Sequence, residues 1–178
     1  MLYLDTDIIV KGDISTLYNT DFEGNYFVGC LDNTSDPEQR LGLKEYINSG
    51  VLLMNLSELR SENRMELYWE KVSEPGYSLA LPDQDALNII FNKKIKYVDD
   101  IKWNCFPFFG KLTKEQEDYI KKNSKIVHFV SKRKPWLQEY TDYWYACGQN
   151  DSITKYLYDL YMTYLDETVN YIEQNNAN

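Results

Sequence analysis

Residues 2–13 read LYLDTDIIVKGD, an apolar run that is interrupted by two acids and then resumes. The pattern predicts a buried strand over residues 2–4 and a second short extended segment over residues 8–10. Apolar runs of this kind are typical of strands inside parallel or mixed sheets. Side chains two residues apart on an extended chain point to the same side, so Asp5 and Asp7 are expected to direct both carboxylates at one point beyond the first strand. That arrangement suits a divalent cation, although two acids at this spacing also commonly shape a turn.

A third candidate ligand follows much later in the chain. His128, the only histidine, lies at the end of the apolar segment 126–129. Two carboxylates and one imidazole suit Mn²⁺ better than Ca²⁺, which prefers shells made of oxygen alone. Three positive side chains begin four residues after His128, at Lys132, Arg133 and Lys134. Their charge favours a small phosphorylated ligand. A histidine in such a run also serves as an ordinary core residue, so the residue pattern leaves both interpretations open.

The remaining segments alternate between strands and helices. Strands are expected at residues 26–31, 51–56, 95–98 and 126–129, and helices at residues 58–72, 82–91, 114–122 and 154–174. Ser57 is the expected N-cap of the first of these helices. Asp83, Gln84 and Asp85 open the helix that begins at Pro82, where the helix dipole favours acids, so this cluster is either a helix start or part of a site. Alternating elements of this kind place the chain in the α/β class.

Composition excludes several classes of function. The net charge of -9 disfavours nucleic acid, which selects basic surfaces. Three cysteines without a C-x-x-C pair indicate neither a disulfide framework nor a thiolate zinc site. No apolar run approaches the roughly 20 residues that span a bilayer, which predicts a cytoplasmic protein that is at most peripheral at the inner membrane face. The sequence has no glycine-rich phosphate loop and no serine nucleophile elbow. It has many pairs of acids, but the pattern does not show which two could serve as the catalytic carboxylates of a glycosidase.

Four motifs, taken in order, resemble the retaining family 8 glycosyltransferases. They are LYLDTDIIVKGD at residues 2–13, NSGVLLMNL at 48–56, LPDQDALN at 81–88, and H-F-x-x-x-x-K-P-W at 128–136. The resemblance covers residues 1–145 and implies a GT-A fold, a mixed sheet with flanking helices. It also implies that residues 1–145 are the C-terminal part of the catalytic domain, without the N-terminal nucleotide-binding segment, and that residues 146–178 form a helical tail.

The resemblance also implies a role for individual residues. Mn²⁺, with Mg²⁺ as the alternative, is expected to bind to Asp5, Asp7 and His128 and to bridge the diphosphate of a UDP-sugar. The expected donor-binding residues are Thr6, Asp32, Asn48, Asp83, Ser131 and Lys134, and the expected catalytic residues are Gln84 and Asp85. Gln84 matches the position that faces the anomeric carbon. Ser131 departs from the family pattern, which commonly has a glycine whose amide meets the phosphate.

The implied function is hexose transfer from a UDP-hexose to a glycan or lipid-linked saccharide acceptor, as in bacterial lipopolysaccharide biosynthesis. The alternative is a catalytically silent module that binds a metal and a sugar or assists assembly. The apolar strand at residues 2–4 is expected to have a bare edge, because the strands that flank it in the family are not in this sequence. An unpaired apolar edge predicts a homo-oligomer.

Overall fold

The computed structural model describes residues 1–32, 35–74, 79–106, 112–130, 132–140, 142–144 and 152–176. Its strands are β1 (Leu2–Leu4), β2 (Ile8–Val10), β3 (Phe27–Leu31), β4 (Ile47–Met54), β5 (Ile95–Val98) and β6 (Ile126–His128). Its helices are α1 (Ser15–Tyr18), α2 (Pro37–Leu41), α3 (Leu56–Ser61), α4 (Arg64–Val72), α5 (Pro82–Ile90), α6 (Asp100–Trp103), α7 (Lys114–Asn123), the 3-10 turn η1 (Gln138–Tyr140) and α9 (Ser152–Asn176). None of these helices is long and apolar enough to cross a bilayer.

The larger sheet has the strand order β1-β4-β3-β5. β4 pairs antiparallel with both β1 and β3, and β3 pairs parallel with β5, so the expected mixed sheet with flanking helices is confirmed. Within the described part of the chain, β1 has β4 as its single strand neighbour and therefore forms an edge.

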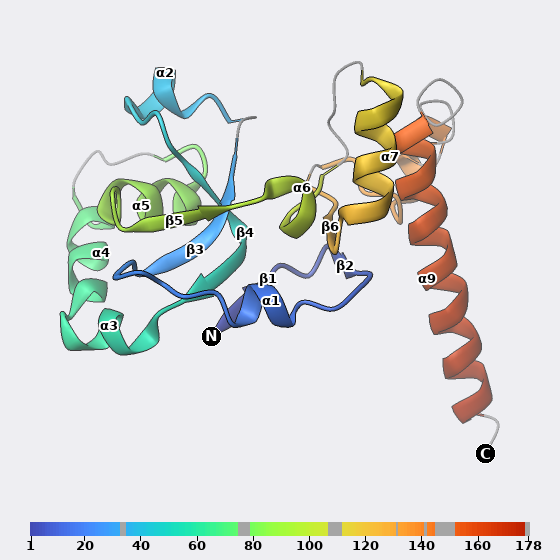
Figure 1. Cartoon of the computed structure of the whole chain (residues 1–178), viewed down its shortest axis with the longest axis horizontal. Coiled ribbons are helices and arrows are strands. Elements are labelled where there is room, and N and C mark those ends of the chain that lie inside the picture. The colour runs from blue at the N-terminus through green and yellow to red at the C-terminus, as the bar shows by residue number, and fades with distance from the viewer. Residues whose placement is uncertain are drawn as a thin grey trace.

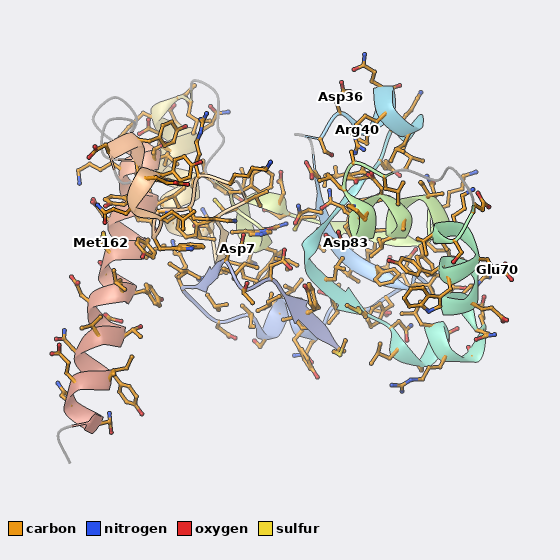
Figure 2. All side chains as sticks on the ribbon, turned by 180° about the vertical axis from the view of Figure 1, so that it is seen from behind. Asp7, Asp36, Arg40, Glu70, Asp83 and Met162 are labelled. Atoms are coloured by element: carbon orange, nitrogen blue, oxygen red, sulfur yellow. The ribbon has the colours of Figure 1, made fainter. Side chains whose placement is uncertain are left out.

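A smaller sheet explains how distant parts of the sequence come together. β2 pairs antiparallel with β6, and the register places Ile8 opposite His128. The two acids between β1 and β2 are therefore carried to the end of β6. In Figure 1 the larger sheet with α2 to α5 forms one lobe, and β2 and β6 with α7 and α9 form the other. Asp7 and Asp83 lie on the facing sides of the two lobes (Figure 2).

Apolar residues fill a core in each lobe. One cluster packs Phe27, Ile47 and Leu52 of the larger sheet against Phe91. A second cluster buries Ile153 and Leu157 of α9 against strand β6 and helix α7. A third cluster packs Leu17, Val51 and Trp103 together. The first half of α9 is thus part of a core, whereas its second half projects away from the rest of the molecule (Figure 1). The expected boundary between residues 145 and 146 lies outside the described residues.

The single helix expected over residues 58–72 is instead two helices, α3 and α4. Asn63 separates them in the left-handed conformation, with φ of 50°, which asparagine adopts more readily than most residues. The expected N-cap Ser57 lies inside α3, and the cap is Asn55, whose side chain accepts a hydrogen bond from the backbone N–H of Glu58. The helix therefore starts directly at the end of β4.

Candidate metal centre and amide network

Three side chains form a compact group of metal-ligating atoms. The Nε2 atom of His128 lies 3.1 Å from Oδ1 of Asp7 and 3.5 Å from Oδ2 of Asp5. One ligand atom from each residue falls within 4.8 Å of the others. His128 is buried, while the two carboxylates are partly accessible to solvent. Two carboxylate oxygens and one imidazole nitrogen suit Mn²⁺, and the accessible side leaves room for further ligands.

The backbone holds the two acids in place. The N–H of Asp5 donates to the carbonyl of Gly50 on β4 at 2.9 Å, and the N–H of Phe129 donates to the carbonyl of Asp7 at 2.9 Å. The hydroxyl of Tyr3 donates to Oδ1 of Asp5 at 2.7 Å, and this bond raises the pKa of the tyrosine. Each acid is therefore anchored to a different strand partner, β4 for Asp5 and the end of β6 for Asp7.

The environment of His128 favours the neutral imidazole. Burial lowers its pKa below the ordinary value, and the opposing attraction of Asp7 and Asp5 does not overcome that effect. Its Nδ1 atom lies 2.9 Å from Oδ1 of Asn104, on the side away from the acids. A neutral imidazole has one nitrogen free to bind a metal, as a ligand histidine requires.

Lys134 places a positive charge beside the same group. Its ammonium contacts Oδ2 of Asp7 and donates to the carbonyl of Phe129 at 2.6 Å. The ammonium also lies 5.7 Å from the centre of the Trp136 ring. Lys134 thus sits at the metal group, whereas Ser131 lies outside the described residues.

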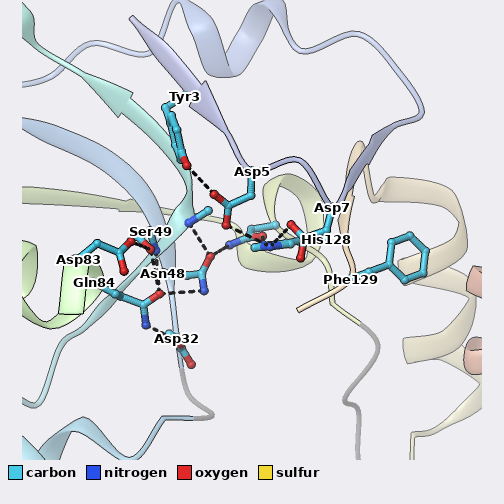
Figure 3. Close-up of polar contacts among 12 residues, drawn as sticks. Tyr3, Asp5, Asp7, Asp32, Asn48, Ser49, Asp83, Gln84, His128 and Phe129 are labelled. Atoms are coloured by element: carbon cyan, nitrogen blue, oxygen red, sulfur yellow. Dashed lines mark hydrogen bonds and ion pairs between the residues drawn. The ribbon is translucent and has the colours of Figure 1, made fainter. Parts of the chain in front are cut away.

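Amide side chains form a buried network next to the metal group (Figure 3). Nε2 of Gln84 donates to Oδ2 of Asp32 at 2.9 Å. Oε1 of Gln84 accepts from Nδ2 of Asn48 at 3.2 Å and from the backbone N–H of Ser49 at 2.9 Å. Asp83 lies at the exposed rim, where it accepts from the hydroxyl of Ser49 at 2.9 Å. The structure therefore brings together four of the expected site residues: Asp32, Asn48, Asp83 and Gln84.

Asp85 has a different environment from its two neighbours in sequence. Its side chain is fully buried, and Arg40 of α2 binds both of its oxygens at 3.0 Å. The hydroxyl of Tyr46 and the backbone N–H of Leu81 also donate to it. Burial alone would raise the pKa of Asp85, but Arg40 and Tyr46 outweigh burial and lower it. Both oxygens of Asp85 are engaged and the residue fastens the start of α5, so its expected catalytic role stays a prediction.

Thr6 and Asp7 open onto a cavity of about 310 Å³, at the small end of the range for ligand pockets. Its other lining residues come from β2, from the segment after β6 and from α9: Ile8, Ile9, Phe129, Trp136, Tyr161, Tyr164, Leu165 and Thr168. Thr6 therefore faces space beside the metal group. The contribution of α9 to this wall could not be foreseen from the motifs.

Sequence reasoning missed four residues of this region: Tyr3, Arg40, Ser49 and Asn104. No local pattern marks Asn104, which follows α6 and is 1% exposed. Arg40 is recognisable only once α2 is seen to lie over α5, as Figure 2 shows for the labelled residue. Tyr3 and Ser49 lie inside two of the four motifs, so membership of a motif was the available signal.

Comparison with known proteins gives consistent matches. The model of a family described as glycosyl transferase family 8 matches residues 1–140. The chain is 33% identical over 138 residues to the glycosyltransferase GlyF of Streptococcus pneumoniae serotype 4, covering 76% of this chain and 33% of that protein. It is 29% identical over 150 residues to the lipopolysaccharide 1,2-glucosyltransferase of Escherichia coli, covering 76% of this chain and 44% of that protein. The chain thus spans less than half the length of these two relatives.

A solved structure agrees with the sequence matches. The galactosyltransferase LgtC, in complex with donor and acceptor sugar analogues, superposes with a TM-score of 0.62 at 26% identity. The superposition covers 79% of this chain and 55% of that one. The GT-A glycosyltransferase architecture expected from the sequence is therefore confirmed for the superposed part of the chain.

Proposed function

This chain belongs to glycosyl transferase family 8, and we propose that it carries the metal-binding and donor-sugar-binding part of a retaining hexosyltransferase that uses a UDP-sugar. The observation that supports this most directly is the meeting of the metal group with the amide network of Gln84 in one region of the fold. A donor diphosphate and a donor sugar need these two environments side by side. The proposed acceptor is a glycan or a lipid-linked saccharide.

The proposed metal is Mn²⁺, with Mg²⁺ as the alternative, held by Asp5, Asp7 and His128. In this position the ion would supply Lewis-acid stabilisation to the oxygens of the departing nucleoside diphosphate. Lys134, which contacts Asp7, supplies a second positive charge at the same place. We assign Lys134 and Thr6 to the diphosphate side of the donor, because charge develops there as the glycosidic bond breaks.

Asp32, Asn48 and Asp83 are proposed to bind the hydroxyls of the donor sugar, and Gln84 to face its anomeric carbon. The bonds of Gln84 bear on the mechanism. Its Oε1 accepts from Asn48 and Ser49, and an amide oxygen so engaged is a poor nucleophile. This supports a front-face reaction with retention, in which the leaving diphosphate takes the acceptor proton, over a covalent glycosyl-enzyme.

The test is UDP release from a panel of UDP-hexoses, with and without Mn²⁺ and with simple saccharides as acceptors. We expect Mn²⁺-dependent release that a chelator abolishes and that Gln84→Ala depresses with little change in donor affinity. Asp118→Ala, which removes an exposed acid on α7, is the matched control and should be active. Mn²⁺ binding without UDP release from any donor would contradict the enzymatic proposal and favour the alternative of a metal- and sugar-binding module.

A further inference from the structure

We propose that Asn104 is a positioning residue that selects the tautomer of His128 and couples the metal ligands to Gln84. The second half of this inference rests on the proposed function, whereas the first half does not. The Asn104 side chain lies between Nδ1 of His128, at 2.9 Å, and Oδ1 of Asn48, at 2.8 Å. Asn104 is 1% exposed, so both contacts are buried away from bulk solvent.

Fixed backbone donors decide which way each amide points. The backbone N–H of Gly50 donates to the Asn48 side chain at 3.0 Å, so the atom that receives it is the oxygen. That oxygen also faces Asn104, which must therefore present its NH₂ group to Asn48. The oxygen of Asn104 is then left to face His128, and Nδ1 of the imidazole must carry the proton. Nε2 consequently directs its lone pair at the two carboxylates, the tautomer that metal binding requires.

The far end of the network is fixed in the same way. The backbone N–H of Ser49 donates to Gln84, which identifies the receiving atom as the oxygen and turns the NH₂ group to Asp32. Oδ2 of Asp32 accepts this hydrogen bond. The donors therefore all run in one direction from His128 through Asn104, Asn48 and Gln84 to Asp32. Turning any one amide over would bring two donors or two acceptors together in a buried place, which is costly.

Asn104 therefore has two separable functions. Its oxygen accepts from the metal-binding histidine and orients the ring, and its NH₂ group supports Asn48 beneath Gln84. Outer-shell partners of ligand histidines typically change metal affinity by about 10- to 100-fold when they are removed. Loss of the second contact should disturb Gln84 even when the metal site is full.

The experiment uses the single histidine of the chain as a reporter. ¹⁵N NMR of the imidazole in the metal-free protein above neutral pH is expected to show the Nδ1–H tautomer in the wild type. Asn104→Leu should shift the ring towards the other tautomer and weaken Mn²⁺ binding by about 10- to 100-fold. Asn104→Asp keeps an oxygen at Nδ1 and should retain both the tautomer and most of the affinity. If the leucine variant does not fold, Asn104→Ala removes the same two contacts.

Asn88→Leu is the matched control. Asn88 is also 1% exposed and uses its side chain to bind the backbone of Ile47 and the carbonyl of Gln84, without contact to His128. It should lose stability but keep the tautomer and the Mn²⁺ affinity. An unchanged tautomer and affinity in both Asn104→Leu and Asn104→Ala would overturn the proposal, as would a loss in Asn104→Asp equal to that in Asn104→Leu.

The coupling to Gln84 has its own readout. At Mn²⁺ concentrations that saturate Asn104→Leu, UDP release should stay below that of the wild type because Asn48 has lost its support. Full recovery at saturating Mn²⁺ would overturn the coupling. Absence of UDP release from the wild type would contradict the proposed function. It would not affect the tautomer assignment, which the NMR experiment tests independently.

Discussion

Gly50 lies so close to His128 that a Cβ atom at position 50 would be 2.2 Å from Cε1 of the imidazole. The same Cβ would lie 2.7 Å from Oδ2 of Asp5. The carbonyl of Gly50 accepts from the N–H of Asp5, and its N–H donates to Asn48. Strand β4 therefore meets the metal group at the one position in the motif that has no side chain.

Gly50→Ala should consequently damage the metal group. The added methyl must displace the His128 ring or the Asp5 carboxylate, and we expect at least a tenfold weaker affinity for Mn²⁺ together with a loss of about 1–3 kcal/mol in the free energy of unfolding. Titration calorimetry and urea unfolding measure the two effects. Gly29→Ala is the control, because its Cβ would meet Cδ1 of Ile47 at 2.5 Å in the core. Gly29→Ala should lose stability and keep its Mn²⁺ affinity. Normal Mn²⁺ binding by Gly50→Ala would contradict the prediction and show that the His128 ring moves aside without loss of the site.

Removal of ligands should abolish metal binding. Asp7→Ala and His128→Ala each delete one of three candidate ligands, so Mn²⁺ affinity should fall well over tenfold, while Asp118→Ala binds normally. Burial lowers the pKa of His128, so protons compete with the metal only below its ordinary pKa of about 6.5. Calorimetric titrations should therefore give similar affinities at pH 8 and pH 7 and falling affinity under acid conditions. Unchanged binding in both alanine variants would remove the site assignment.

Lys134→Met should separate metal binding from nucleotide binding. The ammonium of Lys134 contacts Oδ2 of Asp7, a proposed metal ligand, and repels a cation bound beside it. Mn²⁺ affinity without nucleotide should therefore rise, by about two- to tenfold if roughly 0.4–1.4 kcal/mol of repulsion is relieved. UDP affinity measured with Mn²⁺ present should fall. Lys132→Met, which removes an exposed positive charge two residues away, is the control and should change the Mn²⁺ affinity and the UDP affinity little. Equal effects of the two variants would show that only the net charge of the protein matters.

Arg40→Met should destabilise the fold through Asp85. The substitution leaves a fully buried carboxylate without its cation, and we expect a loss of about 3 kcal/mol, the lower end of the usual range because Arg40 is itself a quarter exposed. The pKa of Asp85 is lowered in the folded state, so the stabilisation is present above about pH 4 and is lost as pH falls through the folded pKa. Urea unfolding of wild type and variant should therefore differ at pH 7 and converge in acid. If the difference in the free energy of unfolding were as large in acid as at pH 7, the loss would come from packing and not from the ion pair with Asp85.

Self-association is expected through the β1 edge. In the described part of the chain β1 pairs only with β4, and Tyr3 at its centre is 43% exposed. Unpaired strand edges invite pairing with another copy, and a lysine on the edge opposes it. Light scattering over a range of concentrations should show a dimer that Tyr3→Lys weakens and Tyr18→Lys, on α1, does not. Loss of the dimer in Ile172→Lys alone would place the contact on the exposed end of α9, and a monomer at all concentrations would contradict self-association.

The sequence by itself determined the class of the fold and most members of the site. The alternation of short apolar runs with helical segments indicated a mixed α/β structure, because periodicity reports which face of each element is buried. Motifs in the sequence marked the candidate residues in three places. These are Asp5 and Asp7 after the first strand, Asp83 and Gln84 at a helix start, and His128 six residues before Lys134. Their relation to one another was supplied by a family resemblance, since local pattern carries no information on distance.

Tertiary structure alone decided which of these side chains are free to act and what holds them. Asp83 and Asp85 look alike in the sequence, yet Asp83 lies at the exposed rim and Asp85 is buried against Arg40. Arg40 belongs to α2 and precedes Asp85 by 45 residues, so the local sequence does not reveal this pair. Asn104 carries no motif and gains its role only where α6 brings it between His128 and Asn48. A hydrogen bond depends on the position of both partners within a few tenths of an ångström. Only the packed fold, which brings together residues 48, 104 and 128, specifies those positions.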